Sequence, residues 1–355
     1  MRPVTLSILG GIAIASAVAA VVFLPPADDA GQARLGERLF PDLATRAGDV
    51  QAIELQRPDG TIVLRRAGET WVLPERGGYA ADTGRIRQLF VEVSELRTLE
   101  AKTRSKDVYA SLEVEDRDAA GAKSTRVAFK TAQGQDIVAL LAGKNRFGRG
   151  GGGDDAVYVR RAGDAQAWLA KGRLTVNRDA VQWLERGLSD VARERVREAR
   201  IDHADGTSTV VSRPSPAERD FVLADVPEDR KAKTGWEIGS VAAAFEKLEF
   251  DDVRKADGVA IPAAALTATT TTFDGLEISA RLVEIEGTPW AALSAKATPP
   301  AQLPEGGPAL KSADEVRAEA ERIQTRLAPW LFKLPVFNLE NMRRKTDDLL
   351  EPKDP

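Results

Sequence analysis

The first long stretch of the chain is apolar, because residues 4–24 contain no charged side chain. A helix of this length spans about 31 Å at 1.5 Å per residue, close to the roughly 30 Å hydrocarbon core of a bilayer. Arg2 precedes the stretch, and Asp28 and Asp29 follow it. Since positive charge stays inside, the pattern predicts a single-pass anchor in the cytoplasmic (inner) membrane, with residues 1–3 in the cytoplasm and the bulk of the chain in the periplasm.

Two other interpretations of this stretch stay open. Ala17-Val18-Ala19 fits the small-residue site at which a secretory signal peptide is cleaved, although the apolar run continues from Ala20 to Leu24. A buried helix of a soluble domain is the third interpretation, which the terminal position and Pro25-Pro26 disfavour. Because the chain contains no cysteine, a lipoprotein anchored through an acylated cysteine is excluded.

Beyond a polar linker, residues 25–44, a hairpin pattern occurs twice. In each case an Asp-Gly pair separates two runs of alternating apolar and polar residues, and glycine favours such a turn because it adopts positive φ. The repetition indicates an internal duplication. The predicted strands are 50–56 and 62–66 around Asp59-Gly60-Thr61, then 196–202 and 209–213 around Asp205-Gly206-Thr207.

An amphipathic helix follows each hairpin. Five apolar residues recur at the same helical spacing in both copies, which places them on one stripe that faces a sheet. The stripes are Ile86, Leu89, Phe90, Val93 and Leu96 in the first copy, and Ile238, Val241, Ala242, Phe245 and Leu248 in the second. Further strands are predicted at 71–73, 125–130, 136–142 and 156–161, and at 221–223, 266–272, 276–284 and 290–294.

Helices are expected to close each copy. Asn177 and Asn338 are suitable N-caps, because the asparagine side chain accepts a hydrogen bond from a first-turn N–H. Ser312 and Glu315 form a capping-box pattern before another helix. The apolar residues expected on the helices that the two asparagines open are Val181, Leu184 and Leu188, then Met342, Leu349 and Leu350.

These elements together predict an α+β fold. One N-terminal transmembrane helix is followed by two similar tandem units of antiparallel sheet packed with helices. The first unit covers residues 45–191, and the second covers residues 192–355 with the C-terminal helices. A single large domain is the alternative.

Composition narrows the classes of function. The 50 basic and 54 acidic residues give a net charge of −4, which provides no general attraction to nucleic acid. The absence of cysteine excludes disulfides, thiolate nucleophiles, thiolate zinc sites and iron–sulfur clusters, and a single histidine excludes a multi-histidine metal site. We therefore expect no nucleic-acid partner, no metal and no cofactor.

One glycine-rich segment resembles a nucleotide-binding motif. Residues 148–153 satisfy the spacing GxGxxG, but a dinucleotide site needs a helix directly after the loop. Asp154-Asp155 and the predicted strand 156–161 follow instead, and two carboxylates would repel a phosphate. The segment is therefore interpreted as a hairpin loop.

The remaining candidates for chemistry are charged residues that we expect on the solvated surface. His203, the only imidazole, lies beside a predicted turn with no nucleophile elbow in the sequence. General acid–base catalysis needs two carboxylates in different environments, which a sequence does not reveal. We expect no catalytic residue among the paired carboxylates and the arginine run: Asp154-Asp155, Asp251-Asp252, Asp347-Asp348, Arg193, Arg195, Arg197 and Arg200. The six tryptophans, Trp290 among them, are expected to pack in the core or at interfaces.

Several short stretches make the chain resemble the DUF4340 family, named for a domain of unknown function. They are Glu69 to Leu73, Ala156 to Arg160, Trp183 to Arg186, Phe273 to Leu276 with Trp290 following, Phe332 to Pro335, and Asp347 to Leu350. The resemblance covers most of residues 45–350. It implies a bacterial, single-span, envelope-facing protein, and it extends to relatives associated with ABC transporters of the gliding-motility auxiliary type. It assigns no catalytic residue.

The expected function is a non-catalytic, membrane-tethered periplasmic module that serves an ABC-type transporter or envelope complex through contact with a protein partner. The first alternative is a ligand-binding module that holds a polysaccharide or lipid fragment in a cleft between the two repeats. The second alternative is a hydrolase with two carboxyl groups about 5–10 Å apart in a pocket.

Overall fold

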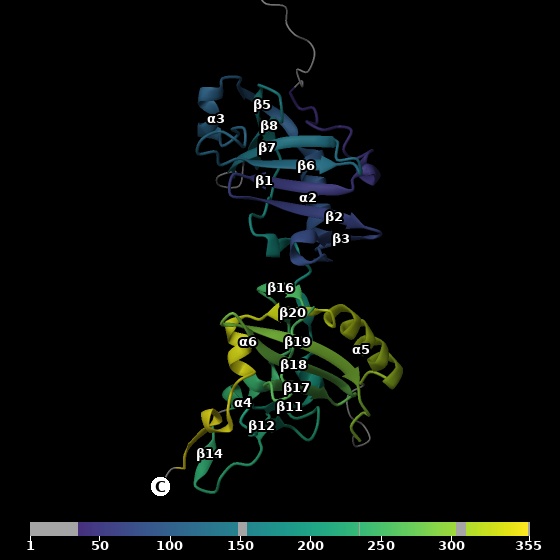
Figure 1. Cartoon of the computed structure of the whole chain (residues 1–355), viewed down its shortest axis with the longest axis vertical. Coiled ribbons are helices and arrows are strands. Elements are labelled where there is room, and N and C mark those ends of the chain that lie inside the picture. Colours follow the sequence, from purple (N-terminus) through teal and green to yellow (C-terminus); the bar gives the residue numbers. More distant parts are fainter. Residues whose placement is uncertain (1–34, 148–154, 234, 303–309, 354–355) are drawn as a thin grey trace, which may run out of the picture. The chain divides into compact units, whose positions relative to one another are not determined.

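The computed structural model describes residues 35–147, 155–233, 235–302 and 310–353 (Figure 1). The predicted anchor at residues 4–24, the tip before it and most of the linker lie outside these ranges. Within the described ranges, no helix combines the length and the apolar character needed to cross a membrane.

The chain falls into two compact units. Of the described residues, unit 1 contains those up to Gly48, Phe90–Val127 and Val138–Thr175, and unit 2 contains Asp49–Leu89, Ala128–Ile137 and those from Val176 onward. The repeat boundaries expected from the sequence, 45–191 and 192–355, stay a prediction.

Nine strands form the first sheet, in the order β4-β3-β2-β1-β6-β7-β8-β9-β5. Burial alternates along β1, where Ile53 and Leu55 are fully buried and Ala52 and Glu54 are half-buried. The strands are β1 Ala52–Arg57, β2 Gly60–Ala67, β3 Thr70–Leu73, β4 Tyr79–Ala80, β5 Arg97–Thr103, β6 Thr125–Lys130, β7 Asp136–Arg146, β8 Ala156–Arg161 and β9 Ala167–Lys171.

Eight strands form the second sheet, in the order β13-β12-β11-β17-β18-β19-β20-β16. All of its neighbours for which the register is known run antiparallel, for example Ile278 opposite Thr270 and Ala280 opposite Leu293. The strands are β11 Val196–Asp202, β12 Ser208–Ser212, β13 Val222–Leu223, β16 Asp252–Lys255, β17 Thr267–Thr272, β18 Leu276–Ile285, β19 Thr288–Ala297 and β20 Trp330–Lys333. Two small sheets pair β10 Gly187–Ser189 with β15 Leu248–Glu249, and β14 Arg230–Ala232 with β21 Leu350–Pro352.

The two large sheets follow the same strand order. If β4 is set aside, the order β3-β2-β1-β6-β7-β8-β9-β5 corresponds strand by strand to β13-β12-β11-β17-β18-β19-β20-β16. A second correspondence is that the segment preceding each sheet pairs with the last residue of an apolar stripe. In the first copy the N–H of Leu39 donates to the carbonyl of Leu96 at 2.8 Å, and in the second copy Ser189 of β10 pairs with Leu248 of β15. Leu96 and Leu248 end the two matching apolar stripes of the sequence.

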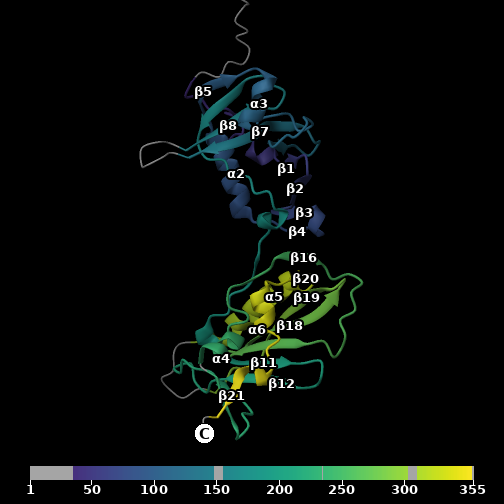
Figure 2. The ribbon, with the colours of Figure 1, turned by 90° about the vertical axis from the view of Figure 1, so that its left-hand side faces the viewer.

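Five α-helices lie in the described residues: α2 Thr83–Glu95, α3 Lys106–Leu112, α4 Gly235–Ala242, α5 Ala313–Leu327 and α6 Val336–Asn341. Ile86, Leu89 and Val93 of α2 are buried, as the stripe predicts. Helix α5 lies against β18 and β19 (Figures 1 and 2). The described chain is therefore an α+β structure of antiparallel sheets packed with helices, which confirms that part of the predicted fold class.

Several predicted helices are shorter than expected or absent. Residues 180–183 form only a 3-10 turn, η3 Ala180–Trp183, which Asp179 caps, and the chain then extends into β10. Pro335, not Asn338, precedes α6, which ends at Asn341 before η5 Thr346–Leu349. Helix α4 ends at Ala242, yet Phe245 and Leu248 beyond it are buried. In each case the apolar residues of the predicted helix are buried in the core although the chain around them is not α-helical.

The two Asp-Gly turns differ in detail. Arg57 pairs with Gly60, so Pro58 and Asp59 are the loop residues, and Gly60 does not adopt positive φ. The expected turn geometry is therefore wrong in the first copy, where proline fixes the loop instead. In the second copy Gly206 has a φ of +84°, as predicted.

Candidate functional site

The glycine-rich segment 148–153 lies outside the described residues, as does Asp154. The other candidate residues named from the sequence lie within the described ranges. The environment of His203 differs from the prediction. Its side chain is buried rather than solvated, with Nε2 at 3.2 Å from Oγ1 of Thr209. The backbone N–H of His203 also bonds to Thr207, which holds the hairpin closed. This histidine is part of the hairpin structure.

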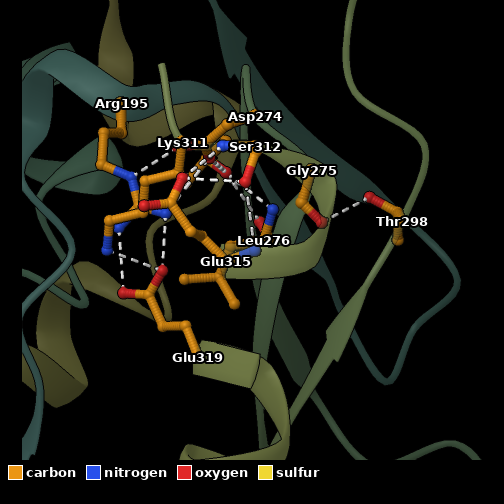
Figure 3. Close-up of polar contacts among 10 residues, drawn as sticks. Arg195, Asp274, Gly275, Leu276, Thr298, Lys311, Ser312, Glu315 and Glu319 are labelled. Carbon is orange, nitrogen blue, oxygen red and sulfur yellow. Dashed lines mark hydrogen bonds and ion pairs between the residues drawn. The ribbon is translucent and has the colours of Figure 1, made fainter. Parts of the chain in front are cut away.

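Arg195 is also not a solvated surface charge. It ends the 3-10 turn η4 Arg193–Arg195, and its guanidinium lies between two carboxylates (Figure 3). Nε is 2.9 Å from Oδ2 of Asp274, and Nη2 is 2.9 Å from Oε2 of Glu319. Lys311 adds a second cation at 2.9 Å from Oε2 of Glu319. The side chain of Asp274 is 0% exposed.

The charges of this cluster form a network of ion pairs within the fold. Burial by itself raises the pKa of Asp274, but hydrogen bonds from Arg195 and Thr272 outweigh it and lower the pKa overall. Burial likewise opposes hydrogen bonds from Arg195 and Lys311 at Glu319, where the pKa is also lowered. Both carboxylates are therefore ionised near neutral pH, which suits an ion pair and not a general acid. The cluster ties α5 to the turn between β17 and β18.

Asp251 and Asp252, one of the carboxylate pairs, have different partners, and Asp348 caps a short helix. Asp252 accepts a hydrogen bond from Arg76 at 2.8 Å, whereas Asp251 lies 3.9 Å from Nη2 of Arg186. Asp348 accepts the backbone N–H of Lys345 at 2.9 Å, which caps η5. Within the described part of the chain, no group of three or more histidine or acidic residues is placed to hold a metal ion.

A groove on unit 2 brings together residues that the sequence does not connect. It has a volume of about 440 Å³ and lies along β16. Its lining contains one aromatic ring, three cationic side chains, two carboxylates, one valine and one glycine. These residues are Trp290, Arg76, Arg254, Lys255, Glu75, Asp252, Val253 and Gly77.

Strand register places the aromatic ring beside a cation. Arg254 faces Leu331 of β20, and Leu331 in turn faces Ala292 of β19. Trp290 is two residues from Ala292 along β19, so its side chain shares the face of Arg254. The guanidinium carbon lies 5.6 Å from the centroid of the Trp290 ring, which is a cation–π contact.

The opposite wall of the groove is the turn after β3. The 3-10 helix η2, Pro74–Arg76, begins with proline and ends at Gly77, whose φ is +67°. A Cβ at Gly77 would lie 3.0 Å from Cγ of Lys255 and 3.3 Å from Cζ3 of Trp330. Glycine therefore permits both the left-handed turn and its close approach to β16. The ion pair of Arg76 with Asp252 joins the two walls.

Sequence reasoning did not find this groove. It identified Asp252 only as one of a carboxylate pair and Trp290 only as a packing residue, and it did not single out Arg254 or Lys255. The one available signal was the alternation of Asp252, Val253 and Arg254, which is too short to predict a strand.

The described residues form an α+β protein of large antiparallel sheets with an open groove along β16. A family model described as "Domain of unknown function (DUF4340)" matches residues 71–269, more than half of the chain. The chain belongs to the DUF4340 family. No curated protein and no solved structure shows a significant match to it.

Proposed function

We propose that this protein is a non-catalytic module that is tethered to the cytoplasmic membrane and works on its periplasmic side. The observation that carries the proposal is the uncharged stretch at residues 4–24, with Arg2 before it and acidic residues after it. A polar linker and two large sheets follow that stretch.

The body of the protein is proposed to be a tandem duplication. Support comes from the matching order of eight strands in the two large sheets and from the matching entry contacts at Leu96 and Leu248. Duplication of one unit provides two related surfaces for partners.

The proposed role is that of an accessory or scaffold component of an ABC-type transporter or another envelope complex. The family resemblance supports the association with transporters. Arg195, Asp274 and Glu319 of unit 2 hold structural elements together, which agrees with a role in contact rather than catalysis.

Fractionation tests the tether. The full chain should stay in the membrane pellet after alkaline washing, and a variant that lacks residues 1–34 should be released. In spheroplasts, an externally added protease should degrade the body of the full chain. Release of the full chain with a mature N-terminus near residue 20, or protection from the protease, would contradict the proposal.

Purification from detergent-solubilised membranes tests the partner. A tagged full chain should recover the permease or another envelope protein in stoichiometric amount, and a tagged anchor segment alone should not. Recovery of the chain by itself under several mild detergents would overturn the accessory role.

The groove favours a second candidate function, which is binding of a polysaccharide or lipid fragment. Its volume of about 440 Å³ lies within the range of roughly 300–1,000 Å³ that is usual for small-molecule sites. It is lined by residues 75–77 from the first predicted repeat and by residues 252–255 and 290 from the second. Calorimetric titration of the full chain with oligosaccharides tests this function, and the absence of binding would contradict it.

A further inference from the structure

The groove of unit 2 presents two cationic side chains without a carboxylate partner among the described residues. Arg254 and Lys255 are exposed, and neither takes part in an ion pair there. The carboxylate of Asp252 is already bonded to Arg76 at 2.8 Å, so these two charges offset each other. The remaining groove charges are those of Arg254, Lys255 and Glu75, and positive charge prevails.

Arg254 is placed where it could bind an anion. Its guanidinium carbon lies 5.6 Å from the centre of the Trp290 ring, a cation–π contact that keeps the group beside the ring. A guanidinium can form two parallel hydrogen bonds to a carboxylate or phosphate. Lys255, the next residue on β16, adds a second positive charge to the lining of the groove.

Trp290 supplies the apolar part of the site. Its ring is only half-buried, and it lines the groove together with Arg254. An aromatic face next to charged groups suits a ligand with one apolar and one charged side. A sugar ring with an acidic substituent has this character, since the C–H face of the ring packs on an aromatic surface while the substituent carries the charge.

The geometry points to an anionic saccharide as the ligand of this groove: the acidic group bonds to Arg254, Lys255 adds positive charge to the lining, and the sugar ring packs on Trp290. The inference rests on the second proposed function, the ligand-binding groove, and it names the class of ligand. The acidic group is a carboxylate in an acidic polysaccharide or a phosphate in a glycolipid headgroup, and both present negatively charged oxygens that accept two hydrogen bonds from a guanidinium.

Calorimetric titration of the full chain in detergent tests the inference. The probes are a tetrasaccharide of galacturonic acid, the neutral tetrasaccharide of galactose, and a soluble sugar phosphate that represents a glycolipid headgroup. The acidic tetrasaccharide should bind at least about tenfold more tightly than the neutral one, and its affinity should fall as salt is raised. Binding of the sugar phosphate alone would also support the inference and would identify the headgroup as the source.

Variants locate the site. Combined Arg254→Gln and Lys255→Gln should weaken binding of the acidic probe about tenfold or more and remove most of its salt dependence, and Trp290→Ala should weaken it to a similar extent. The control combines Lys106→Gln with Lys123→Gln, which removes the same charge from exposed positions elsewhere, and it should bind as the parent does. Thermal unfolding of each variant establishes that it is folded.

Two results would overturn the inference in different ways. Equal binding of the acidic and neutral tetrasaccharides, lost in Trp290→Ala, would disprove the anionic class and leave the groove as a saccharide site. No binding of any probe by the folded parent chain would disprove the ligand-binding groove as well.

Discussion

Arg195 shows how much a single side chain contributes to this fold. It bonds to Asp274 and Glu319 at once, although these residues come from a turn and a helix that lie far from it in the chain. Asp274 is completely buried, so its carboxylate depends on Arg195 for charge compensation. Glu319 has Lys311 as a second partner and depends on Arg195 less.

Replacing Arg195 by methionine should therefore lower the free energy of unfolding by about 3–5 kcal/mol, because it leaves the Asp274 carboxylate buried without its partner. Urea denaturation of the two proteins measures the difference. The matched control is Arg317→Met, which breaks the exposed pair with Asp314 on α5 and should have a far smaller effect. Equal losses in both variants would contradict a special role for Arg195.

The same cluster predicts a dependence of stability on acid. The pKa values of Asp274 and Glu319 are lowered in the folded chain, so their contribution is fully present above the unfolded values of about 3.9 and 4.3. It is lost as the pH falls from there through the folded values, because the unfolded chain then binds more protons.

The free energy of unfolding should thus decline below about pH 4.3, and a Glu319→Gln variant should decline less steeply over that range. Denaturation curves collected at several pH values from 6 to 3 provide the measurement. If the variant and the parent decline in parallel, Glu319 does not contribute in this way.

At the scale of elements, local signals determine where α5 begins. The hydroxyl of Ser312 accepts the N–H of Glu315 at 3.3 Å, and the carboxylate of Glu315 accepts the N–H of Ser312 at 2.8 Å. The sequence predicted this capping box from the two residue types and their spacing alone. The chain that leaves β19 toward α5 is held at Gly275, whose carbonyl accepts a hydrogen bond from the side-chain hydroxyl of Thr298 at 3.1 Å (Figure 3).

Ser312→Ala should lower the free energy of unfolding by about 0.5–2 kcal/mol, since it leaves a first-turn N–H of α5 without its partner. Ser105 offers a control of the same residue type, because it precedes α3 but makes no capping hydrogen bond with its side chain. Ser105→Ala should change the stability much less, and thermal denaturation distinguishes the two. A larger effect at Ser105 would argue against capping as the cause.

The strands divide into those that the pattern predicts and those that it does not. Strands β6 and β8 have the bounds expected from alternation, Thr125–Lys130 and Ala156–Arg161. Strand β9 was missed because four of its five residues are buried, which removes the alternation. Strand β16 was missed because it has only four residues, three of them charged. Strand β16 is at the edge of its sheet and β9 is next to the edge strand β5. Both are recognised as strands through their backbone pairing with neighbouring strands, which the residue pattern does not show.

At the scale of the molecule, unit 2 is joined by aromatic residues from distant parts of the chain. Tyr79 of β4 is 2% exposed and contacts three rings edge to face: Phe250 at 5.3 Å, Trp330 at 5.0 Å and Phe332 at 6.0 Å between ring centroids. Its hydroxyl donates to the carbonyl of Glu185 at 3.3 Å. Burial raises the pKa of this hydroxyl, so it stays protonated at all physiological pH values.

Tyr79→Ala should lower the free energy of unfolding by about 3–5 kcal/mol, as expected for loss of a large buried ring. Tyr79→Phe keeps the ring and removes only the hydroxyl, so its cost should be about 0.5–1.5 kcal/mol. Guanidinium denaturation followed by tryptophan fluorescence compares them. Similar losses in the two variants would show that the hydrogen bond, and not the ring packing, carries the stability.

The sequence by itself determined the features that depend on residues close together in the chain. The second Asp-Gly turn, the α2 stripe and the capping box of α5 each involve neighbours within a few positions, so their geometry follows from local sterics and hydrogen bonding. The α+β class followed from the order of these elements.

Only the tertiary structure decided what the charged groups do. Arg195 and Arg200 are the same residue type five positions apart, yet one side chain is 14% exposed between the carboxylates of Asp274 and Glu319 and the other is 46% exposed. The groove likewise exists because β16, β19 and the turn at Gly77 approach one another in the folded chain. The strength of a charge interaction depends on burial and on distant partners, and neither is encoded in the spacing of residues along the chain.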